Sequence, residues 1–287
     1  MTAEVERVID GHLHIMPLPM IKADALSLLR ASYDDFESVA ELMLHPTKLL
    51  NFLDAQGVEK AVLVNYVSPQ VLGFTEEVND WVAAFVKEAP DRLVACGSVH
   101  PRLCKDPASE LKRIIYDLGV RVLKIHPPHQ LFFPNDYRCG DAALEQVYKV
   151  AEESSIPIIF HTGTSIFPRA RNQYGDPMFL DDVAVDFPRL KIVIAHGGRP
   201  LWTETAFFLL RRHSNVFLDI SGIPPQRLLS WFPRVEEFAH KTLFGSDWPG
   251  PGVRSIRANV EQLCALPLSK AARKDILAET ALRVFAL

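Results

Sequence analysis

Histidine and aspartate close several apolar segments of this sequence, and they are residue types that can hold a divalent metal. The set comprises His12, His14, His126, His161, His196 and Asp247. Imidazole nitrogens together with a carboxylate oxygen suit zinc and similar ions, and a coordination position left open can bind water or substrate. The residue types therefore predict a metal site with a reactive position.

The apolar segments that carry these residues belong to a series of eight predicted β-strands. The strands cover residues 8–14, 60–66, 93–99, 122–126, 156–162, 191–197, 215–221 and 242–248. Stretches with helical periodicity separate most of them, which is typical of a parallel sheet covered by helices. Runs such as IPIIF and KIVIA are apolar on both faces, as expected for strands between a barrel interior and a helical shell. We predict the α/β class and a single (β/α)8 TIM-barrel domain over residues 1–287.

The strand ends bring the candidate ligands together. In such a barrel the carboxyl ends of the strands converge on one face, where active sites are built. Side chains alternate along a strand, so His12 and His14 share a face and can chelate one ion. Taken alone, each histidine could be satisfied by backbone hydrogen bonds, and Asp247 could belong to a turn or cap a helix. Because these histidines and Asp247 all fall at the same end of several strands, a shared metal site is favoured over separate structural roles.

Helix signals and two long loops complete the predicted barrel. Asp106 and Pro107 predict an N-cap and a first helical residue, and Gly119 predicts a left-handed residue after that helix. Further helices are predicted at 76–88, 141–154, 178–186, 202–212, 225–239 and 255–263, and from 269 to the C-terminus. Residues 17–46 and 167–177, which follow the first and fifth strands, are predicted to be long loops on the active face.

Several residues near this face are candidates for substrate contact. We expect them to include His126, Arg169, Arg199 and Trp248. A guanidinium can clamp a substrate carboxylate, although loop arginines are otherwise simply solvated. The loop aromatics Phe132, Phe133, Phe167 and Tyr174 suit either a flat substrate or internal packing. His100 and His129 are further candidates, whereas His45, His213 and His240 lack ligand spacing and are expected to be solvated or packed.

Polar residues within the predicted strands leave their roles open. Lys124 fits a buried lysine, a salt-bridge partner or a carbamylated ligand that bridges two metals. Asp10 fits either a carboxylate that orients a ligand or a structural pair, because a buried carboxylate needs a partner. Asp219 and Ser221 are expected to cap the next loop.

Composition and charge exclude several classes of protein. The 31 basic and 35 acidic residues leave a net charge of −4, which gives no electrostatic footprint for nucleic acid. No apolar run approaches the roughly 18 residues that span a bilayer, and the start MTAEVERVID lacks the basic and apolar regions of a signal peptide. Four widely spaced cysteines predict neither a disulfide framework nor a zinc ribbon. We expect a soluble, cytoplasmic protein without a membrane or nucleic-acid partner. Residues 206–210 fit either a homodimer contact or the buried face of a helix.

Four motifs resemble the amidohydrolase superfamily, in particular its amidohydrolase-related branch. They are IDGHLH at the first strand, FHTG after the fifth, IAHGG after the sixth and FGSDWP after the eighth. The resemblance implies that His12, His14, His161 and Asp247 hold one divalent metal, usually zinc, and that His196 lies beside the metal-bound water. Superfamily members with two metals carry a carboxylated lysine at the end of the fourth strand. In this sequence the predicted fourth strand ends with His126, and Lys124 stands two residues earlier. Because the lysine is not at the end of the strand, the resemblance favours the form with one metal.

The resemblance implies an enzyme that acts on a small molecule. We expect a hydrolase in which metal-bound water attacks an amide, ester or lactone carbonyl, Asp247 accepts the proton and His196 polarises the carbonyl. The alternative is a metal-dependent, non-oxidative decarboxylase of an aromatic or unsaturated carboxylic acid. A third possibility is a barrel that binds a small molecule or a partner without catalysis. The expected cofactor is one zinc ion, with manganese second and no organic cofactor.

Overall fold

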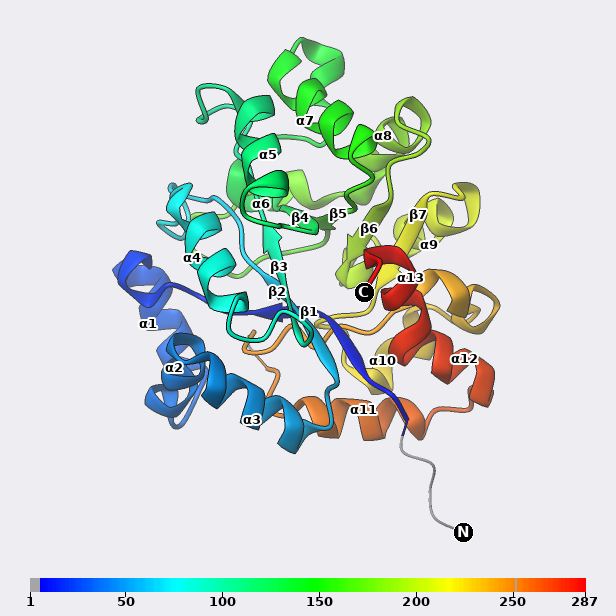
Figure 1. Ribbon diagram of the computed structural model, residues 1–287. Helices are drawn as coiled ribbons and strands as arrows, with labels where there is room; N and C mark the ends of the chain where they lie inside the picture. The colour runs from blue at the N-terminus through cyan, green and yellow to red at the C-terminus, as the bar shows by residue number, and fades with distance from the viewer. Residues whose placement is uncertain (1–5, 251) are drawn as a thin grey trace.

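Eight parallel strands form one sheet in sequence order, and the chain winds them into a barrel with helices outside (Figure 1). The computed structural model describes residues 6–250 and 252–287. The strands are β1 Ile9–His14, β2 Lys60–Val64, β3 Leu93–Gly97, β4 Val122–Ile125, β5 Ile158–His161, β6 Ile192–Ala195, β7 Val216–Asp219 and β8 Thr242–Leu243. The predicted TIM barrel is confirmed, and every strand except β1 ends earlier than predicted at its carboxyl end.

The barrel closes through backbone contacts that lie mostly beyond its last strand. β8 has only two residues, yet the chain after it continues alongside β1. The Gly11 amide donates to the Phe244 carbonyl at 2.9 Å, and the His14 amide donates to the Trp248 carbonyl at 2.7 Å. The segment after β8 is thereby fixed against the segment that carries the first histidine pair.

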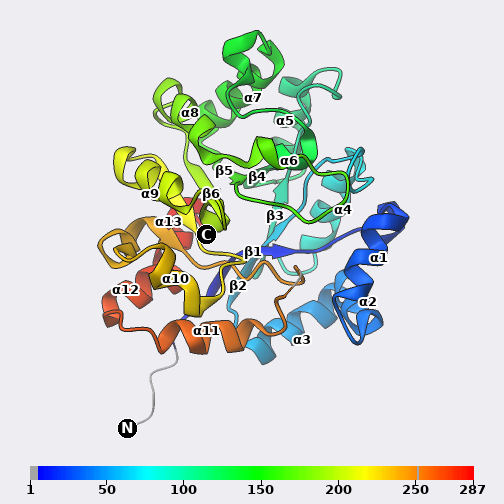
Figure 2. The same cartoon turned by 180° about the vertical axis from the view of Figure 1, so that it is seen from behind.

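Thirteen α-helices of the described chain surround the strands, as the two opposite views show (Figure 2). They are α1 Ala23–Ala31, α2 Phe36–Leu44, α3 Pro46–Gln56, α4 Glu77–Val86, α5 Pro107–Tyr116, α6 Pro127–Gln130, α7 Ala142–Glu153, α8 Leu180–Asp186, α9 Thr203–Arg212, α10 Pro225–Trp231, α11 Ile256–Cys264, α12 Lys270–Lys274 and α13 Thr280–Phe285. Shorter 3-10 turns are η1 Leu18–Met20, η2 Asp136–Cys139, η3 Asn172–Gly175, η4 Pro177–Phe179, η5 His196–Gly198 and η6 Val235–Lys241, and a π-turn, η7 Asp275–Glu279, joins α12 to α13. In the described part of the chain, no helix has the length and apolar character needed to cross a membrane.

Several predicted helix boundaries follow from local sequence. The Asp106 side chain accepts a hydrogen bond from the Ser109 amide, and Gly119 is left-handed with φ 72°, so both predictions for this helix are confirmed. The long loop predicted at 17–46 is wrong, because α1 and α2 lie within it. Their apolar residues recur at helical spacing, and the Asp35 side chain caps α2 through the Ser38 amide.

The two predicted helices near the C-terminal end are interrupted. The helix predicted at 225–239 ends at Trp231, and η6 follows it. The helix predicted from residue 269 contains the π-turn η7, whose Ile276, Leu277 and Ala278 are buried. All four cysteines are free, as expected.

The barrel interior is apolar at the end opposite the candidate ligands. Inward residues of the strands, such as Val62 and Val193, pack with Phe285 and Val284 of α13, so this helix plugs the barrel. Phe285 is 2% exposed. The plug leaves the carboxyl ends of the strands as the face at which ligands can enter.

Phe285→Ala should lower the free energy of unfolding by about 3–5 kcal/mol, because it removes a buried aromatic ring and leaves a cavity at the plug. Chemical denaturation followed by circular dichroism measures the change. Phe208→Ala is the matched control, since Phe208 is 44% exposed. Equal unfolding midpoints for the two variants would contradict the role of α13 as the plug.

Candidate metal centre

The first histidine pair faces the barrel mouth because β1 is irregular. Ile9 points into the barrel interior, whereas Leu13 packs in the core outside it. Strict alternation would give residues 9 and 13 the same face, but the pairing of β1 with β2 shifts register between Asp10 and Leu13. His12 and His14 consequently point inward together, with their Nε2 atoms 3.2 Å apart.

Asp247 reaches the same point from the other side of the barrel closure. Its amide donates to the His12 carbonyl at 2.8 Å. Its Oδ1 lies 3.3 Å from His14 Nε2 and 3.8 Å from His12 Nε2. Asp247 has φ 62°, a left-handed conformation that is costly for a residue with a side chain and that clusters at functional sites.

The charge state of Asp247 follows from its neighbours. Burial opposes ionisation of this carboxyl, but the hydrogen bond with His14 and the electrostatic influence of the neighbouring His12, His14 and Arg199 side chains outweigh it and hold the pKa of Asp247 below the usual value. Oδ2 faces Arg199, whose Nη2 is 3.4 Å away. One carboxylate oxygen thus faces the histidine pair and the other faces the guanidinium.

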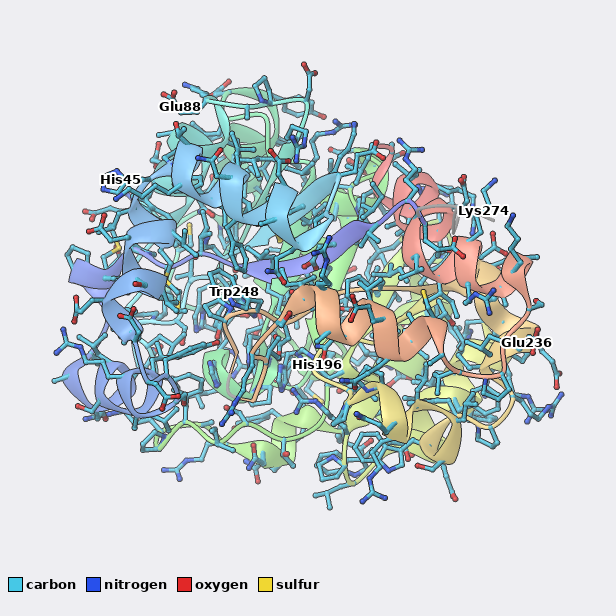
Figure 3. The ribbon with its side chains drawn as sticks, turned by 90° about the horizontal axis from the view of Figure 1, so that it is seen from below. His45, Glu88, His196, Glu236, Trp248 and Lys274 are labelled. Carbon is cyan, nitrogen blue, oxygen red and sulfur yellow. The ribbon has the colours of Figure 1, made fainter. Side chains whose placement is uncertain are left out.

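His196 and His161 complete the group at the mouth. His196, which is also left-handed with φ 66°, has its Nδ1 2.9 Å from the Ser221 carbonyl. His12, His196 and Asp247 each offer one potential ligand atom, all within 4.8 Å of one another. The His161 ring lies 4.7 Å from that of His196, and its Nε2 is buried without a hydrogen-bond partner among the described residues. Figure 3 shows His196 inside the molecule, while His45 and Glu88 lie at its edge.

Asp219 orients the first histidine, a contact that was not among the predicted roles of this residue. Its Oδ2 lies 2.5 Å from His12 Nδ1, and its Oδ1 accepts a hydrogen bond from the Ser221 amide at 2.8 Å. Asp219 therefore caps the next loop, as expected, and also holds His12. A carboxylate on the far nitrogen fixes the tautomer and orientation of a metal-binding imidazole. The inward position of Asp219 at the end of β7 was the available signal.

Asp219→Asn should weaken metal binding about 10- to 100-fold, because an amide removes the negative charge that supports His12. Competition with a chelator of known affinity, using zinc and manganese, measures the change. Asp91→Asn on the exposed surface is the matched control. Unchanged affinity in Asp219→Asn would contradict the orienting role.

Burial keeps the imidazoles in the form that binds metal. Burial lowers the pKa of His12, His161 and His196 well below the usual value, and nearby cations act in the same direction. These rings are neutral and offer lone pairs. Lys124 lies beneath them, 1% exposed, with Nζ 3.4 Å from His12 Nε2. Burial lowers the pKa of Lys124 to about 8, although Asp219 and Asp247 oppose that effect.

A cavity of about 160 Å³ opens above the candidate ligands. His14, His161, His196 and Asp247 line one end, together with Lys124 and Arg199. Apolar side chains form much of the remaining wall, including Met16, Leu29, Leu72, Phe74 and Phe167. The Arg199 Nε is buried and has no partner among the described residues. The cavity thus combines convergent polar groups with apolar walls, as small-molecule sites do.

Three imidazoles stack along another wall of the cavity. The His126 ring lies 3.8 Å from that of His161 and 3.6 Å from that of His129. His129 Nδ1 is 3.0 Å from the Tyr66 hydroxyl, and its Nε2 is 2.7 Å from Ser165 Oγ. Burial lowers the pKa of His129 to about 3 and raises that of Tyr66, so the imidazole is neutral and the phenol keeps its proton.

The structure places other predicted contact residues away from the cavity. The Arg169 side chain is 58% exposed and pairs with Asp24 at 3.0 Å. Trp248 is buried against Phe52, with ring centroids 4.7 Å apart, and does not line the cavity. Asp10 accepts backbone hydrogen bonds from His12 and Ser246, so it holds the strand rather than an imidazole.

Some of the predicted loop aromatics and histidines line the cavity, and the others pack against neighbouring side chains. Of the four loop aromatics, Phe167 alone lines the cavity. Phe133 packs against Tyr174, and Phe132 packs against His100. His129 lines the cavity and His100 does not.

The donor atoms at the barrel mouth are of the kinds that bind a divalent metal. Neutral imidazoles and an ionised carboxylate crowd together, and the buried Nε2 of His161 lacks a partner among the described residues. A buried acceptor without a partner is costly unless a ligand satisfies it. The supporting carboxylate on His12 completes the arrangement found at metal sites.

Comparisons with known proteins agree with this geometry. The family model described as Amidohydrolase matches residues 9–287. A 2-amino-3-carboxymuconate-6-semialdehyde decarboxylase from Dictyostelium discoideum is 24% identical over 149 residues, which cover 46% of this chain and 40% of that protein. The chain thus matches less than half the length of this curated relative.

Solved structures share the fold over nearly the whole chain. An uncharacterised TIM-barrel protein from Bordetella bronchiseptica is 24% identical with a TM-score of 0.77, and the match covers 98% of each chain. A 5-carboxyvanillate decarboxylase from Novosphingobium aromaticivorans, in complex with manganese and a nitrobenzoic acid, is 17% identical with a TM-score of 0.71 over 100% of each chain. A dihydroxybenzoic acid decarboxylase from Polaromonas, with manganese and an inhibitor, is 18% identical with a TM-score of 0.73 over 98% of this chain and 97% of that one.

Proposed function

The chain belongs to the amidohydrolase family, and from that premise we propose that it is a metal-dependent, non-oxidative decarboxylase of a small carboxylic acid. It is an enzyme of the amidohydrolase superfamily, and its named relatives include decarboxylases. The observation that carries the proposal is the cavity, in which two cationic side chains flank the candidate metal ligands and apolar residues form the opposite wall.

We propose that His12, His14, His161 and Asp247 bind one divalent metal. A bound divalent ion would act as a Lewis acid on the carboxylate of the substrate. The imidazoles of His12 and His161 are available as neutral ligands, and Asp247 offers Oδ1, the oxygen that faces His12 and His14. Manganese accompanies the two decarboxylase structures described above, so we propose manganese beside zinc as the working ion.

Arg199 is the residue that we assign to the substrate carboxylate. Its side chain is 22% exposed and lines the cavity, and its buried Nε has no partner among the described residues. A guanidinium with a free N–H can donate a charge-assisted hydrogen bond to a carboxylate. The Lys124 ammonium adds positive charge at the floor of the cavity. This cationic end favours an anionic substrate over a neutral amide or ester. His126 lines the wall beside it and is proposed to contact the body of the substrate.

Decarboxylation requires a proton at the carbon that loses its carboxyl group. The bond between that carbon and the carboxylate breaks, its electron pair takes up the proton, and carbon dioxide leaves. Because Asp247 is ionised at rest, the proton comes from solvent water; we propose that Asp247 Oδ2, the oxygen turned away from the histidine pair, takes up this proton and passes it to the carbon. We assign His196 to orienting the reacting group. The apolar wall limits access of water to the carbon.

Hydrolysis was the first expectation from the sequence, and the same ligand set could serve it. The named relatives support decarboxylation instead. A small-molecule substrate is common to both reactions. The homodimer, the cytoplasmic location and the absence of a nucleic-acid partner stay predictions.

The test is release of carbon dioxide by enzyme loaded with manganese or zinc. A panel of hydroxybenzoic and unsaturated dicarboxylic acids is assayed beside a panel of amides, esters and lactones. We expect metal-dependent release of carbon dioxide from members of the acid panel. Hydrolysis of the second panel without release of carbon dioxide from the first would overturn the proposal and support the hydrolase function instead.

A further inference from the structure

Tyr66, His129 and Ser165 form a hydrogen-bonded chain along the cavity wall that the proposed reaction does not use. Tyr66 is 5% exposed and His129 is 1% exposed, while Ser165 is half-buried. The distances are 3.0 Å from the Tyr66 hydroxyl to His129 Nδ1 and 2.7 Å from His129 Nε2 to Ser165 Oγ. All three residues line the cavity that contains Asp247.

The direction of the hydrogen bonds follows from counting protons. His129 is neutral and carries one N–H, so it donates at one nitrogen and accepts at the other. Among the described residues, His129 is the hydrogen-bond partner of the Tyr66 hydroxyl. Tyr66 therefore donates to Nδ1, and Nε2–H of His129 donates to Ser165 Oγ.

Ser165 is left with one proton to donate. Its oxygen accepts from His129 and also from the Phe167 amide at 3.3 Å, which fills both acceptor positions of a hydroxyl. No described residue accepts from this hydroxyl. If the hydrogen bonds ran the other way, Ser165 would donate to His129 and His129 would donate to Tyr66. The proton without a partner would then lie on the deeply buried Tyr66, where an unused donor costs more than at half-buried Ser165.

The Ser165 oxygen accepts the Phe167 amide at 3.3 Å, but two other hydrogen bonds also hold this loop, and neither uses the hydroxyl. The Ser165 amide donates to Asn172 Oδ1 at 2.8 Å, and the Arg171 amide donates to the Pro128 carbonyl at 2.9 Å. Those bonds survive removal of the hydroxyl. The proton of this hydroxyl has no acceptor among the described residues, and it faces the cavity, so it is available to a ligand.

The donor stands apart from the candidate metal end. His126 is stacked between His161 and His129, and the ring centroids of His161 and His129 are 6.4 Å apart. Ser165 contacts the edge of His129, the ring at the end of the stack away from His161. A substrate whose acid group is held near His161 and Arg199 can reach Ser165 only with an atom on another part of its body.

We propose that the Tyr66–His129–Ser165 chain presents a fixed hydrogen-bond donor that selects carboxylic acids bearing a second oxygen acceptor, such as a carbonyl or a further carboxylate, remote from the reacting acid group. The inference rests on the proposed function for the placement of the reacting carboxylate. His129 and Tyr66 act as positioning residues, since they fix which way the Ser165 proton points.

Binding of matched acids to the metal-loaded protein tests this selection without turnover. The probes are meta- and para-acetylbenzoate and the isopropyl analogues of the same shape, measured by calorimetry. We expect wild type to bind at least one acetyl isomer about tenfold more tightly than its isopropyl partner, the ratio that one net hydrogen bond gives. Ser165→Ala should lose this ratio, Ser165→Thr should keep it, and Tyr66→Phe should lose part of it. Ser230→Ala, on an exposed part of α10, is the matched control.

Equal binding of the acetyl and isopropyl acids to wild type would overturn the inference. Loss of the ratio in Tyr66→Phe with retention in Ser165→Ala would also overturn it, because the spare proton would then belong to Tyr66. A clear ratio that depends on Ser165, with no carbon dioxide released from any acid, would support the inference while the decarboxylase proposal failed.

Discussion

Asp247→Asn is expected to lower turnover by about a thousandfold or more, because acid–base catalysis by a positioned group contributes roughly 10²–10⁴ and this variant also weakens a metal ligand. In the structure, Oδ1 of Asp247 faces the histidine pair, and Oδ2 faces Arg199 and the cavity. An amide keeps the size and one oxygen of the side chain. It has no oxygen that can hold a proton for transfer.

The measurement is the single-turnover rate of carbon dioxide release, with metal content determined on the same preparation. Asp91→Asn on the surface controls for the substitution itself. Metal content distinguishes the two roles of Asp247: loss of rate with metal retained supports proton transfer, whereas loss of both supports a ligand role. Near-wild-type turnover with metal retained would contradict the assignment of Asp247 to the reaction.

His161→Ala is expected to remove most of the bound metal and all measurable turnover. The Nε2 of His161 is buried and has no protein partner among the described residues, so the imidazole has no evident structural use for that lone pair. His161 is one of the four ligands that we propose, and its loss leaves two imidazoles and one carboxylate, which would hold the ion less tightly.

Elemental analysis of wild type and His161→Ala, purified without chelator, makes the comparison. His45→Ala is the matched control, because His45 lies on the surface between α2 and α3 (Figure 3). We expect about one equivalent of metal in wild type and in the control, and a small fraction of it in His161→Ala. Full metal content in His161→Ala would remove His161 from the ligand set. About two equivalents of metal in wild type would support a site with two metals bridged by carbamylated Lys124.

Much of the candidate site could be predicted because its signals are local. The buried runs and the residues that close them identify the strand ends, and parallel strands in a barrel bring those ends to one face. His12, His14, His161, His196 and Asp247 were predicted this way, and the structure does bring them to one cavity wall or its edge.

Residues on loops were predicted less well, because periodicity says nothing about where a loop side chain points. Arg199 and Arg169 looked alike in sequence, yet Arg199 enters the cavity while Arg169 pairs with Asp24 on the surface. Trp248 follows Asp247 directly but packs outward against Phe52. The segment at 17–46 was predicted as a loop although its helices are capped and periodic.

The barrel and the residue types at its mouth could be predicted from the sequence, because alternation, capping and buried runs are properties of neighbouring residues. Packing of distant segments sets what the local pattern leaves open: it shifts the register of β1 between Asp10 and Leu13, which turns the shared face of His12 and His14 inward. It also decided that Asp219 holds His12 across 207 residues of chain. Such contacts depend on the register between strands and on the closure of the barrel. Both arise when distant segments pack together, so no local pattern of residues specifies them.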